Sequence, residues 1–279
     1  MDKWREVYKK LRKNKLALVG GGVVLFYILI AVMAPLLSTH DPYQIDLMNR
    51  LKPPSMDHWM GTDDKGRDIF SRLLYGTRLS LTVGFLSVFI GAFIGIFLGL
   101  ISGYYGKWVD TIIMRIIDVL LAFPGILLTL AIVSALGPSL INVIIAVGLF
   151  SVPMFARIAR GSTLSAKKME YVDAIRSLGA SDGTIIFKHI FPNILSPIII
   201  QATLRLATAI LTAAGLSFLG LGAQPPLPEW GAMLSNGRDF LYSAPYLAIF
   251  PGLAISTLVI GLNVFGDGLR DALDPRMKK

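Results

Sequence analysis

Long uninterrupted apolar runs are the feature of this sequence that most constrains its fold. Each run has roughly 20 residues, which at a rise of about 1.5 Å per residue crosses the hydrocarbon core of a bilayer. Apolar residues make up 54% of the chain and charged residues 16%, against about 45–50% and about 25% in soluble domains. A purely soluble enzyme is therefore excluded. The runs predict an all-α integral membrane protein with six transmembrane helices, at about residues 17–37, 80–102, 112–136, 140–157, 194–221 and 247–266.

The distribution of charge predicts how these helices are oriented. The formal net charge is +9, and most Lys and Arg lie in the N-terminal tail, in residues 157–188 and from residue 270 onward. Six spans place these segments on one side, and Lys and Arg are enriched on the cytoplasmic side of membrane proteins. We therefore expect both termini in the cytoplasm. The apolar run at 16–37 is longer than that of a signal peptide, so we expect an uncleaved first span. Anionic lipid, and not nucleic acid, is the expected partner of the positive charge.

Sequence patterns of catalytic sites are missing. The chain has no cysteine, which excludes disulfides, thiolate metal sites and cysteine nucleophiles. Residues 61–68, GTDDKGRD, resemble a phosphate-binding loop, but Arg67 replaces the lysine and Asp68 would repel phosphate. Any ATP used must therefore be hydrolysed by another chain. We predict no catalytic residues.

The three histidines fall on different segments of the chain. His40 and His58 belong to a predicted outer segment, whereas His189 lies on the opposite membrane face. This distribution offers no metal-ligand motif. We therefore predict no metal site, and histidines that are solvated or bonded locally.

Two outer segments connect the spans. In the first, residues 38–79, the stretch 67–79 has helical amphipathic spacing, which predicts either a helix lying on the membrane interface or, the favoured interpretation, a lead-in to the second span. The second, residues 223–246, is rich in proline and is expected to be an ordered loop or cap. The long fifth run is expected to tilt or to end in a turn near residues 215–222.

Glycines recur along the second predicted span with a four-residue period, so they share one ridge of a helix. Such a ridge lets another helix approach closely, because packing drives helix association in lipid. The partner helix could belong to this chain, the favoured interpretation, or to another subunit. The helix-packing glycines are Gly91, Gly95, Gly99 and Gly103.

A few polar residues lie within the predicted spans. Arg115 and Asp118 have helical i,i+3 spacing and are expected to pair with each other. Arg205 lies inside the fifth span, where exposure to lipid would cost about 2.5–3.5 kcal/mol. It is expected to face the bundle or a wet cavity, either as a structural anchor or lining a solute path. Weaker candidates for a buried polar or path-lining role are Asn142, Gln201 and Asn263.

The connection between the fourth and fifth spans is long, mixed in charge and patterned as two short helices separated at Gly179. In the first of them an apolar stripe recurs with i, i+3, i+4, i+7 spacing. A stripe that emerges into water needs a partner surface, either the chain's own helix ends or another protein. Its members are Tyr171, Ala174, Ile175 and Leu178.

In this segment the chain resembles the permease subunits of ATP-binding-cassette (ABC) importers, whose cytoplasmic loop carries an E-A-A…G…I-x-L-P pattern. Ala174, Gly179 and Pro192 match the pattern and its spacing. The residues that depart from it are Asp173, Ile175, His189 and Phe191. More specifically, the chain is similar to C-type permeases of the dipeptide, oligopeptide and nickel importer family. This similarity is carried by GTDDKGRDIFSRLLYGTRLSLTVG at 61–84, EYVDAIRSLGAS at 170–181, LSFLGLGAQPPLPEWGAML at 216–234 and GDGLRDALDPR at 266–276.

The resemblance implies a type I ABC importer permease fold in the bacterial inner membrane. Residues 1–79 would form a tail, first helix and outer segment, and 80–279 a permease core with a coupling loop at 158–193 and an outer loop at 223–246. A homologous partner permease, two ATPase subunits that hold ATP and Mg²⁺, and an extracytoplasmic solute-binding protein are implied, with no cofactor on this chain. A coupling helix at about 163–182 would dock on an ATPase through Glu170, Tyr171, Asp173, Ala174, Ile175, Arg176, Gly179, Ala180 and Ser181.

The expected function is that of a transport subunit in an ATP-driven importer of dipeptides or oligopeptides. A nickel or metal-chelate importer of the same family is the alternative, because solute selection is expected to reside largely in the binding protein. More remote alternatives are a secondary transporter or channel, for which Asp118 and Arg205 offer few proton- or ion-binding groups, and a membrane scaffold.

Overall fold

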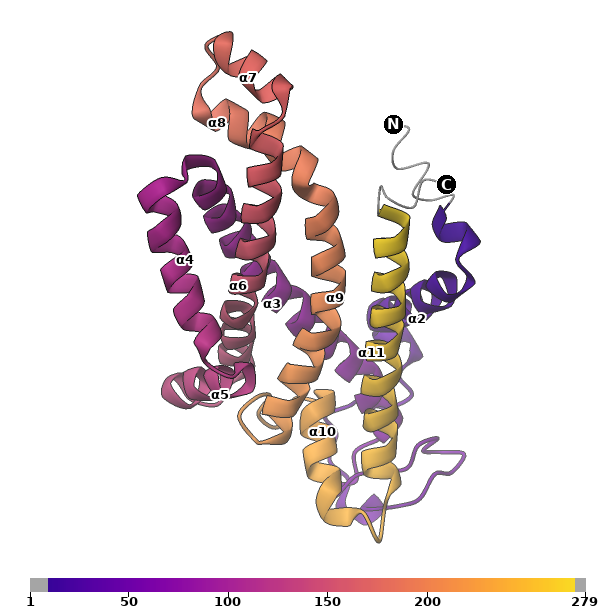
Figure 1. Ribbon diagram of the computed structural model, residues 1–279. Coiled ribbons are helices and arrows are strands. Elements are labelled where there is room, and N and C mark those ends of the chain that lie inside the picture. Colours follow the sequence, from indigo (N-terminus) through magenta and orange to yellow (C-terminus); the bar gives the residue numbers. More distant parts are fainter. Residues whose placement is uncertain (1–9, 274–279) are drawn as a thin grey trace.

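The computed structural model describes residues 10–273 of the chain. Within this range the regular secondary structure is helical. Five helices are long and apolar enough to cross a membrane, and a bent pair brings the total to as many as six, which agrees with the expected architecture (Figure 1). The spanning elements are α2 (Lys15–Leu37), α3 (Ile69–Tyr105), the pair α4 (Lys107–Ala122) and α5 (Gly125–Leu136), α6 (Leu140–Lys167), α9 (Phe191–Phe218) and α11 (Tyr246–Leu273).

The third span is not one continuous helix, in contrast to the expected single run at 112–136. Helices α4 and α5 meet at an angle of 92°. Phe123 has extended backbone angles, as the residue before a proline usually does, and Pro124 cannot donate the hydrogen bond that would continue the helix. The Pro124-Gly125 pair therefore divides the apolar run into two helices.

Close packing of α3 on α6 forms the centre of the bundle, and the glycine ridge of α3 lies in this contact. A Cβ atom on Gly95 would lie 2.5 Å from the carbonyl oxygen of Val152, and one on Gly99 would lie 2.5 Å from that of Ala156. Gly91 and Gly103 similarly face α6. The ridge is thus filled by a helix of the same chain, and these glycines allow the two backbones to approach closely.

The outer segments form a layer at one end of the bundle. Residues 38–68 contain the short helix η1 (Leu47–Asn49), and residues 223–246 contain α10 (Trp230–Gly237) and η3 (Arg238–Phe240). Trp230 is fully buried, and its indole N–H donates to the carbonyl of Leu73 at 3.1 Å. As expected, the second segment is an ordered cap, and α9 ends in a turn at Gly220, where φ is +82°.

The interface-helix alternative for residues 67–79 is wrong, because this stretch leads directly into α3 from Ile69 onward. Arg67 and Arg72 are buried rather than directed at lipid headgroups. Nε of Arg67 donates to Asp63 at 2.7 Å, and Arg72 donates to the carbonyl of Pro42 at 2.8 Å. Protein acceptors therefore satisfy both guanidinium groups.

The connection between α6 and α9 lies at the other end of the bundle (Figure 1). It comprises α7 (Glu170–Ser177), α8 (Asp182–Thr184) and a π-helical stretch, η2 (Ile185–Ile190), that continues into α9. The last turns of α11 lie toward this end as well, and Leu11, near the start of the described chain, packs against Leu269 and Ala272. The two ends of the described chain therefore lie together.

Candidate functional site

Helix α7 packs one face on the bundle and leaves the other exposed. Val172 is fully buried in a cluster with Ile185 and Ile190, and Tyr171 and Ile175 are partly buried against the same cluster. The predicted apolar stripe is therefore divided. Tyr171 and Ile175 face the chain's own helices, while Ala174 and Leu178 are exposed, and Leu178 retains 86% of its accessible surface.

The sharp turn after α7 depends on Gly179. This residue has φ of +80°, and its N–H donates to the carbonyl of Arg176 at 3.0 Å. The N–H of Ala180 donates to the carbonyl of Ile175 at 3.3 Å, which completes a Schellman motif that ends the helix. A side chain on Gly179 would meet open space, so the requirement for glycine comes from the backbone conformation.

Hydrogen bonds fasten this segment to two spanning helices. The hydroxyl of Tyr104, in the last turn of α3, donates to Asp182 at 2.6 Å. The amide of Asn193, in the first turn of α9, donates to the hydroxyl of Tyr171 at 2.9 Å. Ser181 caps α8 by accepting from the N–H of Thr184 at 3.4 Å. These bonds link α8 to α3 and α7 to α9.

The outward surface of α7 mixes charge with apolar side chains. Asp173 and Arg176 form an ion pair of 3.2 Å, and both side chains are exposed. Glu170 begins the helix and is also exposed. Together with Ala174 and Leu178, these groups form a surface that a second protein could contact by both burial and hydrogen bonding.

The four polar residues considered for a solute path do not lie together. Arg205 and Gln201 are one turn apart on α9 and partly buried, and the guanidinium carbon of Arg205 lies 5.8 Å from the centre of the Phe150 ring. Asn142 instead closes the α5–α6 turn, because its amide donates to the carbonyl of Gly137 at 2.8 Å. Asn263 is exposed on α11.

The expected ion pair between Arg115 and Asp118 is wrong. The carboxylate of Asp118 instead accepts from Arg157 of α6 at 2.7 Å, because α6 runs beside α4 and brings this guanidinium within reach. A stronger neighbouring pair escaped the sequence analysis. Arg160 donates two hydrogen bonds to Asp110, at 2.5 and 2.6 Å, in the bidentate arrangement that is strongest for arginine and a carboxylate.

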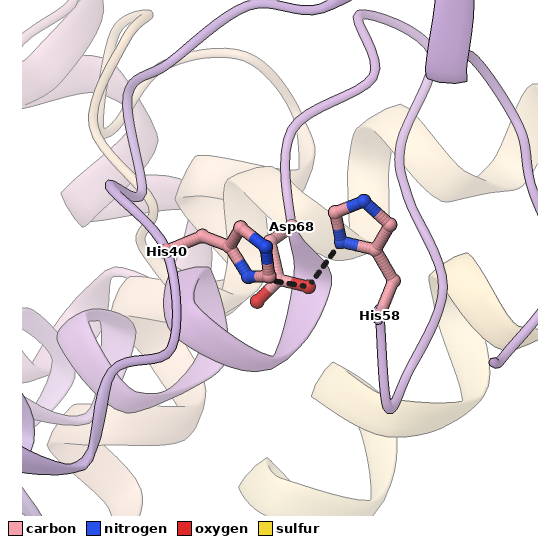
Figure 2. A group of neighbouring side chains, drawn as sticks. All are labelled: His40, His58 and Asp68. Atoms are coloured by element: carbon pink, nitrogen blue, oxygen red, sulfur yellow. Dashed lines mark hydrogen bonds and ion pairs between the residues drawn. The ribbon is translucent and has the colours of Figure 1, made fainter. Parts of the chain in front are cut away.

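Two of the three histidines lie close together, although the sequence offered no metal-ligand motif. Figure 2 shows His40 and His58 on either side of Asp68, the N-cap residue of α3. Nδ1 of His58 lies 2.9 Å from the Asp68 carboxylate. The separation of these residues along the sequence gave no indication of the contact, because the contact depends on how residues 38–68 fold over the start of α3.

Glu229, the N-cap residue of α10, is a buried carboxyl group outside the spanning helices. Its carboxylate accepts from the N–H of Ala232 at 3.0 Å. Burial raises the pKa of Glu229 above its ordinary range, and this effect outweighs the opposing effect of the hydrogen bonds. The sequence analysis did not single out this residue.

Comparison with known proteins supports the resemblance found in the sequence. Residues 95–279 match the family model of the "binding-protein-dependent transport system inner membrane component", and residues 3–54 match that of the "N-terminal TM domain of oligopeptide transport permease C". The dipeptide transport system permease protein DppC of Alkalihalophilus pseudofirmus is 55% identical over 99% of this chain and 90% of its own length. The glutathione transport system permease protein GsiD of Pectobacterium atrosepticum is 51% identical over 99% of this chain and 92% of its own length.

Solved structures of ABC transporters share the fold at lower identity. A chain of the MetNI methionine ABC transporter, in an inward facing conformation, superposes with a TM-score of 0.58 at 20% identity and covers 74% of this chain and 98% of its own. A chain of an amino acid ABC transporter gives a TM-score of 0.54 at 19% identity and covers 75% of this chain and 95% of its own.

These findings define the protein as a type I ABC importer permease, a membrane transport subunit and not an enzyme. The chain belongs to the family of binding-protein-dependent transport system inner membrane components. Within that family it is a C-type permease, the type found in the ABC importers of peptides.

Proposed function

We propose that this permease forms half of the translocation path of an ATP-driven peptide importer in the bacterial inner membrane. Two relatives that align over nearly the whole chain are named for transport of a dipeptide and of glutathione, both short peptides. A homologous permease would supply the other half of the path. A solute-binding protein outside the membrane would deliver the peptide to the layer formed by residues 38–68 and 223–246.

The site that carries the proposal is the exposed face of α7. Helix α7 lies at the same end of the bundle as the two ends of the described chain, and the excess of Lys and Arg supports a cytoplasmic location for that end. In this proposal an ATPase subunit docks there on Glu170, Asp173, Ala174 and Arg176. Tyr171, Ile175 and Ala180 hold the helix against the bundle, while Gly179 and Ser181 fix the turn.

The proposed mechanism is mechanical. Two ATPase subunits bind ATP and Mg²⁺, close, and displace α7. The bonds from Tyr104 to Asp182 and from Asn193 to Tyr171 carry this displacement to α3 and α9. These helices then tilt, so that the central path opens alternately to each side. The permease contributes no chemical step of ATP hydrolysis.

Arg205 and Gln201 are the residues of this chain proposed to line the path. A guanidinium that is partly buried in the bundle and contacts Phe150 can bind the carboxylate that every linear peptide carries. Among the described residues, the Arg205 guanidinium has no carboxylate partner. The carboxylate of a passing peptide would therefore not have to displace another carboxylate.

Transport in proteoliposomes tests the proposal. The chain is reconstituted with its partner permease, ATPases and binding protein, and uptake of a labelled dipeptide, of glutathione and of a nickel chelate is compared. ATP-dependent uptake of a peptide is expected. Uptake driven by an ion gradient with this chain alone, or uptake of the nickel chelate in preference to both peptides, would overturn the proposal. The absence of transport by a correctly assembled complex would instead favour a scaffold.

A further inference from the structure

Three potential metal ligands meet in the outer layer, far from α7. One donor atom from each of His40, His58 and Asp68 lies within 4.8 Å of the others. The two imidazole rings face each other with centres 4.6 Å apart and planes tilted by 33°, and the carboxylate lies between them and α3 (Figure 2). These residues come from three separate stretches of the chain.

Surrounding groups hold the carboxylate of Asp68 and the backbone of His40 in place. The Asp68 side chain is 1% exposed, and one of its oxygens accepts from the N–H of Ser71 at 2.8 Å. The hydroxyl of the same serine accepts from the backbone N–H of His40 at 3.1 Å. Ser71 therefore fixes both ligand-bearing residues relative to the first turn of α3, as supporting residues do around metal sites.

The distances leave room for a cation. Nδ1 of His58 lies 2.9 Å from the nearer oxygen of Asp68, but Nδ1 of His40 lies 3.9 Å from that oxygen, beyond hydrogen-bond range. The ligands border a cleft of about 160 Å³. Its other lining residues are acidic, neutral polar or glycine, namely Asp41, Gln44, Asp46, Asn49 and Gly66.

We propose that His40, His58 and Asp68 form a binding site for a divalent transition metal ion, with Zn²⁺ as the best match. Two imidazole nitrogens and one carboxylate oxygen make up a ligand set that zinc uses with a water molecule in the fourth position. Mg²⁺ and Ca²⁺ prefer sites made of oxygen alone. Asp41 and Asp46 add negative charge to the cleft, and no Lys or Arg appears among its described lining residues.

The bound ion would fasten the outer layer to the bundle. It would join the stretch around His40 and the turn around His58 to the start of α3, replacing the single contact between His58 and Asp68. The site is independent of the solute that the importer carries. Its consequence is a stiffer outer layer on the face where a solute-binding protein would dock.

Calorimetric titration of the full-length chain with zinc chloride tests the site. The chain is purified in detergent without a histidine tag and stripped with a chelator. One zinc ion per chain is expected, with affinity reduced about tenfold or more in His40→Ala, in His58→Ala and in Asp68→Asn. Asparagine remains a good N-cap residue, so Asp68→Asn removes the negative ligand while keeping the start of α3. His189→Ala is the matched control and should bind zinc as the parent does.

X-ray absorption at the zinc edge adds a second readout, with two imidazole nitrogens and oxygen ligands at about 2.0–2.2 Å expected. The unfolding midpoint of each metal-free variant is also measured. A midpoint equal to that of the parent shows that the variant is folded and that only zinc binding has been lost. The proposal is overturned if no stoichiometric zinc binds to the folded parent. It is overturned equally if binding persists in His40→Ala and His58→Ala, or disappears in His189→Ala.

Discussion

The hydroxyl of Tyr104 donates a hydrogen bond of 2.6 Å to the carboxylate of Asp182. This bond joins the end of α3 to the first residue of α8, two elements far apart in the sequence. Helix α3 also packs along α6 through its glycine ridge. In the proposed mechanism, a displacement of the connection between α7 and α9 reaches the centre of the bundle through this contact.

Replacing Tyr104 by Phe should weaken the mechanical coupling between α8 and α3. The substitution keeps the buried ring and removes only the donor, at a cost of about 0.5–1.5 kcal/mol in the free energy of unfolding. We expect a lower rate of ATP-dependent peptide uptake at an unchanged amount of assembled complex. Tyr105→Phe is the control, because the neighbouring side chain is 48% exposed. Equal uptake by the Tyr104→Phe variant and the parent would show that this bond carries no coupling.

The turn at Gly179 should tolerate little substitution. Its φ of +80° costs a residue with a Cβ atom about 1–2 kcal/mol, and a β-branched residue more. Gly179→Val is expected to abolish transport while the chain still inserts into the membrane, and Gly179→Asn should retain part of the activity because asparagine tolerates this conformation. Uptake assays and membrane fractionation measure the two effects.

Gly183 offers a control for that experiment. It lies on α8 in the same segment, also has open space around it, and does not have a positive φ. Gly183→Ala should therefore leave transport unchanged. Loss of membrane insertion in Gly179→Val would mean that the glycine is needed for folding rather than for coupling.

The contact between α3 and α6 should be sensitive to any added side chain. Gly99→Val places atoms where the backbone of Ala156 lies, and overpacking of this kind costs about 1–3 kcal/mol. We expect a lower unfolding temperature of the purified chain in detergent. Gly22→Ala, at a site on α2 with no neighbouring atom within 4 Å, should cause no such change. An equal effect of both substitutions would contradict the close approach of α3 and α6.

Glu229 should make stability depend on pH. Because burial raises the pKa of its carboxyl group in the folded protein above the ordinary value of 4.5, the folded state binds more protons than the unfolded state between those two pKa values. Stability should therefore fall as the pH rises from 4.5 to the raised pKa. In Glu229→Gln the free-energy cost of ionising the buried carboxyl group should disappear. The variant should therefore be more stable than the parent at neutral pH.

Thermal unfolding of the chain in detergent at about pH 5 and about pH 8 measures this difference. Glutamine can still accept the hydrogen bond from Ala232, so the cap of α10 is kept. The control is Glu170→Gln, at an exposed position. The same pH dependence in Glu229→Gln and in the parent would contradict the assigned shift.

Patterns with a short period predicted most of the fold. Apolar runs located the spanning helices, and the four-residue glycine period identified the ridge along which α3 meets α6. The break at Pro124 was missed although the Pro-Gly pair is a strong helix-breaking signal, because the apolar composition continues through it. The amphipathic spacing at 67–79 predicted the lead-in that forms the first turns of α3, but not that the carbonyl of Pro42 satisfies Arg72 there.

Contacts between distant segments could not be read from the sequence. Asp118 has a basic residue three positions away, yet it pairs with Arg157 on another helix. His40, His58 and Asp68 meet only because an irregular outer segment folds back over α3. In α7, periodicity identified an apolar stripe but missed Val172, the one residue of that helix that is fully buried.

Site-specific cross-linking tests the central claim, that an ATPase subunit docks on α7. The chain has no native cysteine, so a single cysteine at the exposed position Ala174 can be paired with single cysteines on the ATPase in the assembled, active importer. The account predicts a specific cross-link whose yield changes when ATP binds, and none from Asn263→Cys, which is exposed on a spanning helix. An active complex in which Ala174→Cys cross-links to no ATPase position would contradict the account.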